Sequence, residues 1–173
     1  MHIIIGIIGL AMAAYFLVMR AQRGAEVATE LMDVGRDVAS AARRFGFRRR
    51  TNVHPVDSID DPHLAIGGIG TAFISLADLP TREDRARLDV ALRKHLHLDA
   101  QEAEELEVLG QWFVNECNGA DAAIPRLTKR LAKVGGAHAF APLMEVIQTA
   151  TSAPLSTRQT EALHDIKRAF GLQ

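Results

Sequence analysis

Residues 61–77 read DPHLAIGGIGTAFISLA, and this stretch decides the fold. Asp61 followed by Pro62 is typical of a helix start, because aspartate caps free N–H groups and proline suits the first helical position. Apolar residues then recur at helical spacing as far as Leu76. Glycines within the stretch lower helix propensity, so we expect them where a neighbouring helix approaches closely. These glycines are Gly67, Gly68 and Gly70.

Further helices are expected downstream, because capping signals alternate there with apolar residues at helical spacing. The expected starts are Thr81, Asp99, Asp121, Ala139 and Ser156. Pro125 falls in the expected first turn of the fourth helix. No segment sustains the period-two alternation of a half-buried strand. The predicted fold is therefore all-α, a compact bundle of about six short helices over residues 62–173.

Composition and motifs argue against catalysis. The formal net charge is -1, which provides no overall attraction to nucleic acid. The single cysteine, Cys117, cannot form an internal disulfide or a Cys-x-x-Cys zinc site, and it occupies an apolar helical position. The histidines form no His-x-x-x-His or His-Glu-x-x-His pair, and no P-loop or Gly-x-Ser-x-Gly motif occurs. We expect no enzymatic activity and no cofactor.

Residues 1–20 are expected to form a single transmembrane anchor. Residues 3–19 carry no charged side chain and span roughly 26 Å as a helix, just short of a hydrocarbon core of about 30 Å. A cleaved signal peptide would need a basic start, and a buried core helix would show a polar stripe. Arginines follow the run and none precedes it, which predicts an outside N-terminus and a cytoplasmic C-terminal domain at the bacterial inner membrane.

Residues 21–50 are expected to form a basic, amphipathic juxtamembrane helix. Its apolar residues recur every three or four positions, which suits a coiled-coil seam or a surface that docks on an integral membrane protein. These residues are Val27, Leu31, Val34, Val38, Ala42 and Phe45. Two aromatics and three arginines follow, a composition that suits anionic lipid headgroups or, alternatively, a basic flexible connector. They are Phe45, Phe47, Arg48, Arg49 and Arg50. Residues 51–61 interrupt the periodicity and are expected to be a linker.

The stretches 76–84, 97–106 and 150–159 resemble the loop-and-cap elements of the TerB-like (tellurite-resistance) helical domain. An N-terminal anchor before such a domain is also similar to the membrane-bound DnaJ-like co-chaperones, although the chain lacks a J domain. The resemblance implies paired acidic turns that offer carboxylates to a divalent cation. Asp78 and Glu83 match that pattern, whereas Ser152 and Gln159 replace acidic residues of the second turn. Calcium prefers six to eight oxygen ligands, so the matching positions leave the set incomplete.

Two functions are therefore expected, in order of preference. The first is a membrane-anchored, non-catalytic interaction module, acting as a scaffold or accessory subunit of an inner-membrane complex such as a respiratory assembly. Its partners would be integral membrane proteins and anionic lipid headgroups, with no nucleic acid. The second is a divalent-cation-binding stress-response sensor of the tellurite-resistance type. A basic stripe from 126 to 133 is open to three interpretations: contact with lipid, contact with an acidic partner, or exposure to solvent.

Overall fold

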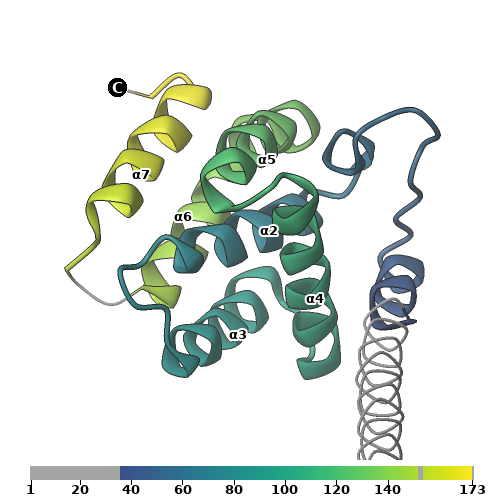
Figure 1. The fold of residues 1–173 in the computed structure, drawn as a ribbon, viewed down its shortest axis with the longest axis horizontal. Coiled ribbons are helices and arrows are strands. Elements are labelled where there is room, and N and C mark those ends of the chain that lie inside the picture. The colour runs from purple at the N-terminus through teal and green to yellow at the C-terminus, as the bar shows by residue number, and fades with distance from the viewer. Residues whose placement is uncertain (1–35, 152–153, 173) are drawn as a thin grey trace, which may run out of the picture. The chain divides into compact units, whose positions relative to one another are not determined.

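The structure is a computed structural model that describes residues 36–151 and 154–172. Its central element is helix α2 (Pro62–Ser75), around which the other helices pack. The surrounding helices are α3 (Arg82–Leu96), α4 (Ala100–Glu116), α5 (Ala120–Gly135), α6 (Phe140–Ala150) and α7 (Thr157–Ala169). Figure 1 shows α4 and α7 on opposite sides of α2. The predicted all-α bundle of six helices is thus confirmed.

Helix α2 is buried on all sides, because every residue from Leu64 to Ile74 is shielded from solvent. The glycines allow the close approaches that the sequence predicted. A Cβ atom at Gly67 would lie 2.4 Å from Cγ of Leu106 on α4, and one at Gly70 would lie 2.8 Å from Cδ1 of Leu88 on α3. Real Cβ atoms do not approach so closely, so α3 and α4 pack against α2 at distances that larger residues would prevent.

Three helices begin with complete capping boxes, at Thr81, Asp99 and Ser156. In each, the cap side chain accepts from the third backbone N–H and the third side chain accepts from the cap N–H, which satisfies two free donors. The predicted starts at these residues are confirmed. The expected position of Pro125 is wrong, since α5 begins at Ala120 and the proline lies in its second turn.

The chain divides into two units, residues 1–37 and 38–173. All the elements named above belong to the second unit, as do a 3₁₀ helix η1 (Pro55–Ser58) and a second, η2 (Gly136–Ala139), that leads into α6. Residues 36–44 are helical. The predicted anchor at residues 1–20 lies outside the described residues. Among the residues that are described, none of the helices combines the length and apolar character needed to cross a membrane.

Candidate functional site

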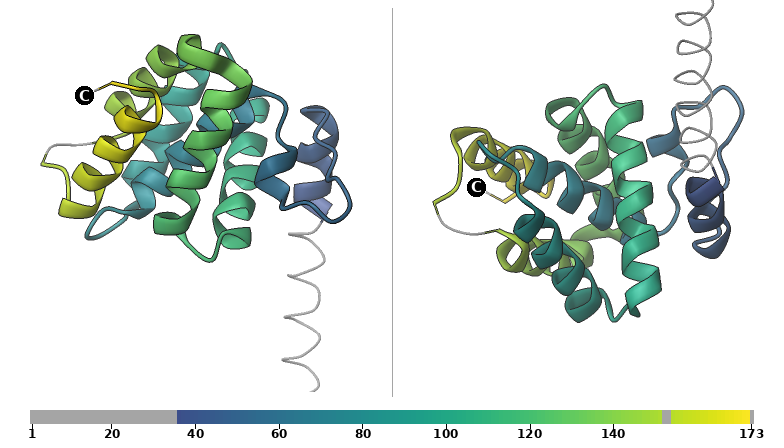
Figure 2. Two further views of the ribbon diagram at one scale, coloured as in Figure 1. Left: turned by 90° about the horizontal axis from the view of Figure 1, so that it is seen from above. Right: turned by 60° about the horizontal axis from the view of Figure 1, so that its bottom comes forward.

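Residues 45–61, here called the strap, lie against α4 and α5 (Figure 2). Its first anchor is Phe47, whose ring meets those of Trp112 and Phe113 edge-on, with centroids 5.8 Å and 5.4 Å apart. Each such pair contributes about 0.5–1.5 kcal/mol beyond the burial of its surface. The Phe47 ring, predicted to sit among lipid headgroups, therefore packs on the domain itself.

The second anchor is the η1 segment, in which Val56 and the following Ile59 are fully buried. His54 precedes this segment, and both nitrogens of its ring are hydrogen-bonded. Its Nδ1 accepts from the N–H of Val56 at 3.3 Å, so the proton lies on Nε2, which donates to the carbonyl of Glu116 at 3.2 Å. Residues 51–61 were expected to be a linker. They are instead part of the packed unit, because two apolar side chains enter its core.

Two arginines of α5 hold the strap by charge. The guanidinium of Arg126 pairs with Asp57 and, through that hydrogen bond, lowers the pKa of the carboxyl group. Arg130 donates from Nε to the carbonyl of Ile59 and also pairs with Asp60 at 2.9 Å. Two of the four basic residues on α5, Arg126 and Arg130, thus bind the strap. The other half, Lys129 and Lys133, is exposed.

The predicted membrane- and partner-binding residues fall into three groups. Val27, Leu31 and Val34 lie outside the described residues. Val38, Phe45 and Phe47 are half-buried against the domain's own core. Of the three arginines, Arg50 pairs with Asp60 at 2.9 Å, whereas Arg48 and Arg49 are exposed and meet no charged partner within the described part of the chain. These two arginines line a hollow of about 510 Å³ together with Asp60 and Asp61.

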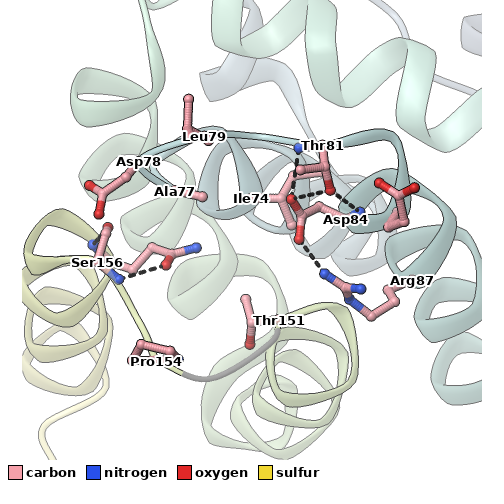
Figure 3. Close-up of a pocket in the computed structure, with 12 residues that line it drawn as sticks. Ile74, Ala77, Asp78, Leu79, Thr81, Asp84, Arg87, Thr151, Pro154 and Ser156 are labelled. Carbon is pink, nitrogen blue, oxygen red and sulfur yellow. Dashed lines mark hydrogen bonds and ion pairs between the residues drawn. The ribbon is translucent and has the colours of Figure 1, made fainter.

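A second hollow, of about 380 Å³, lies where the end of α2 meets the starts of α3 and α7 (Figure 3). The α7 cap closes one side of it. The hydroxyl of Ser156 donates to the carbonyl of Leu76 at 2.8 Å, and Nε2 of Gln159 donates to the carbonyl of Phe73 at 3.1 Å. These bonds go to two carbonyls at the end of α2, of which that of Phe73 also accepts from the N–H of Leu76, so the cap residues bind a helix terminus rather than a ligand.

The carboxylate of Asp84 in this hollow is already fully engaged (Figure 3). Its Oδ2 accepts from the backbone N–H and the hydroxyl of Thr81, both at 2.8 Å, and its Oδ1 pairs with Arg87. Hydrogen bonding from the Thr81 backbone is the largest effect that lowers the pKa of this carboxyl. Asp84 therefore works as a helix cap.

The two predicted metal ligands, Asp78 and Glu83, are exposed side chains at the rim of the same hollow. A hard cation needs several converging oxygen ligands. In residues 36–151 and 154–172, no three acidic, histidine or cysteine side chains come together as a possible metal site. The structure thus adds no further side-chain ligand of these types to Asp78 and Glu83 within that range.

Sequence reasoning missed a hydrogen-bonded chain that joins α3 to α6. Nε2 of His95 lies 2.8 Å from the hydroxyl of Thr149, and its Nδ1 lies 3.1 Å from Oε2 of Glu145. The order hydroxyl, imidazole, carboxylate matches that of hydrolase triads. Thr149 and Glu145, however, lie within α6, where backbone N–H groups bond to the preceding turn and cannot stabilise an oxyanion. We interpret the chain as a clamp between the two helices.

Comparison of the chain with known protein families, curated proteins and solved structures finds no match. The resemblance to TerB-like domains therefore depends on the short loop-and-cap motifs alone. The structure independently establishes a domain of six helices with a strap packed on two of them.

Proposed function

We propose that the protein is a membrane-anchored, non-catalytic interaction module that serves as an accessory subunit of an inner-membrane complex. The observation that carries this proposal is that the apolar and the charged side chains of the strap face different ways. Its aromatic and apolar side chains pack on α4 and α5, while Arg48 and Arg49 are left exposed beside a hollow. A basic surface held on a packed segment suits recognition of an acidic partner or lipid headgroup.

Packing within the domain also reduces the number of apolar residues in the stretch 27–45 that remain for docking on a partner. Val38, Ala42 and Phe45 are packed against the domain's own core, so they contribute to its stability. This leaves Val27, Leu31 and Val34 as the apolar residues that would contact an integral membrane partner. The segment between the charge-free run 3–19 and residue 38 is then the main binding element, and the arginines of the strap add a second contact.

Mild-detergent purification of the tagged full-length chain, followed by mass spectrometry of co-eluting proteins, tests the proposal. We expect a defined set of integral membrane proteins in fixed stoichiometry. Leu31→Glu should abolish their recovery, because a charge in an apolar contact is costly, and Arg48→Gln with Arg49→Gln should reduce it. The matched control removes the same charge from α5 by Lys129→Gln with Lys133→Gln and should leave recovery unchanged.

Two outcomes would contradict the proposal. One is recovery of the full-length chain in the soluble fraction, which would remove the anchor. The other is elution of the membrane-extracted chain alone, with the wild type and all variants behaving alike.

A further inference from the structure

A hollow of about 500 Å³ lies at the corner where the start of α2, the ends of α3 and α5, and the η2–α6 junction meet. Its walls are mainly apolar and include Ile66, Leu96 and Pro142. Gly135 brings α5 to this corner, because a Cβ there would lie 2.6 Å from that of Ala139. A hollow of this size with apolar walls is large enough for the body of a small organic ligand.

Histidines are concentrated around this hollow. Of the seven in the chain, four line it, namely His63, His95, His97 and His138. His95 is held by Glu145 and Thr149. The side chains of the other three make no hydrogen bond or ion pair within the described residues; His63 is half-buried, and His97 and His138 are exposed. Their imidazoles are therefore free to act on a ligand.

The lining favours an anion over a cation. No aspartate or glutamate lines the hollow, and the nearby Glu145 is engaged by His95. An imidazole N–H donates to a carboxylate, and a protonated imidazole adds charge to that bond. A transition metal would need at least three converging ligands, and the described residues contain no such group.

From these features we propose that this histidine-lined hollow binds a small organic carboxylate with an apolar body. The body lies against Ile66, Leu96 and Pro142. The two carboxylate oxygens accept hydrogen bonds from imidazoles of the lining, which are contributed by His63 of α2, His97 directly after α3, and His138 of η2. The site is separate from the strap and from the hollow in Figure 3.

The test uses full-length protein in lipid nanodiscs, with histidine side chains labelled for NMR and titrated with 2-naphthoate. We expect the imidazole signals of His63, His97 and His138 to shift together along one saturable curve. The neutral 2-naphthalenemethanol and the cationic 2-naphthylmethylamine have similar bodies and should bind about tenfold more weakly or not at all, since a tenfold change corresponds to ~1.4 kcal/mol.

Variants decide whether the histidines themselves recognise the anion. His97→Gln and His138→Gln, made separately to preserve folding, should each weaken naphthoate binding several-fold. His164→Gln removes an exposed histidine of α7 outside the hollow and should have no effect. Equal binding of all three naphthyl compounds would overturn the anion assignment. Absence of any saturable shift, or shifts produced by Zn²⁺ and not by naphthoate, would overturn the proposal.

Discussion

The central helix α2 and the strap both pack within one unit, yet different forces hold them. Every residue from Leu64 to Ile74 is shielded, and the helix depends on close apolar contact. The strap inserts a few apolar side chains and is otherwise held by Arg126, Arg130 and His54. Packing in the first case is sensitive to added volume, whereas attachment in the second depends on a few apolar anchors and on charged contacts. The two regions should therefore respond to different substitutions.

The strap should also be separable from the helices. Exposed ion pairs contribute only about 0–1 kcal/mol each, so the half-exposed Arg126–Asp57 pair is a weak constraint. The side chain of Arg130 is 10% exposed and bonds to a backbone carbonyl as well, which makes it the stronger contact. A strap held in this way can detach while α2 remains packed.

The largest effect is expected for Gly67→Val. The added side chain would collide with Leu106, since even a Cβ lies 2.4 Å from its Cγ. Overpacking of this kind destabilises by about 2–3 kcal/mol. Thermal or chemical denaturation of the full chain, followed by circular dichroism, measures the loss. Ala86→Val, which adds two methyl groups on the exposed face of α3, should change stability by less than about 0.5 kcal/mol. Equal effects would show that α2 is not limited by volume.

The next effect is expected for Phe47→Ala, which removes the aromatic anchor of the strap. Truncation of a buried phenylalanine costs about 3–5 kcal/mol, and because Phe47 is half-buried we expect about 2 kcal/mol. Trypsin should then cut faster at Arg48–Arg50, while amide exchange in α2 stays slow. Val53→Ala, at a strap residue that is 39% exposed, is the control. Faster exchange throughout α2 would contradict the separability of the strap.

A smaller effect is expected for Arg130→Gln. The substitution removes a charged donor to the carbonyl of Ile59 and the pair with Asp60, for a loss of about 1–2 kcal/mol. Lys129→Gln changes the net charge equally at the adjacent, exposed residue and should be nearly neutral. Denaturation of the two variants side by side checks the difference. If both variants lose stability equally, the loss comes from the overall charge of α5 and not from the contacts of Arg130 with the strap.

The smallest effect is expected for the pH dependence of stability, through Glu107 of α4. Burial raises the pKa of Glu107 to about 7, with Asp89 adding to the shift. Between pH 4.5 and about 7, the folded state therefore keeps a proton that the unfolded state releases. The contribution of Glu107 to the free energy of unfolding is fully present at low pH and is lost as pH rises through about 7. Solvent near the side chain reduces the effect to about 1 kcal/mol.

Glu107→Gln should remove this part of the pH dependence and make the protein relatively more stable at pH 8. Glu161→Gln, at an exposed residue of α7 that does not contribute to this shift, should leave the pH profile unchanged. Denaturation at pH 5 and pH 8 compares the variants. A wild-type profile for Glu107→Gln would show that this carboxyl is not protonated in the folded state.

The helices were predictable because their signals are local. The capping boxes at Thr81, Asp99 and Ser156 join residues three positions apart, and the prediction of each start is confirmed. The prediction of close approach at the glycines is also confirmed, although the sequence did not say which residue would approach. Only the structure identifies Leu106 and Leu88 as those neighbours.

The strap and the histidine clamp were not predictable for the opposite reason. Asp57 and Arg126 are 69 residues apart, and His95 and Thr149 are 54 apart. Taken alone, Pro55 and the aspartates around it look like a linker, because nothing nearby in the sequence would bind them. Likewise, His95 and His97 look like unrelated surface histidines until the fold brings α2 and η2 beside them.

By itself, the sequence determined the all-α class, the number of helices in the bundle, and the capping residues of α2, α3, α4 and α7, since hydrophobic periodicity and capping depend on neighbours within one or two turns. The tertiary structure alone decided that residues 45–61 are packed, which arginines remain free, and that four histidines share one hollow. Those outcomes depend on contacts between distant segments, which form only when the helices pack around α2.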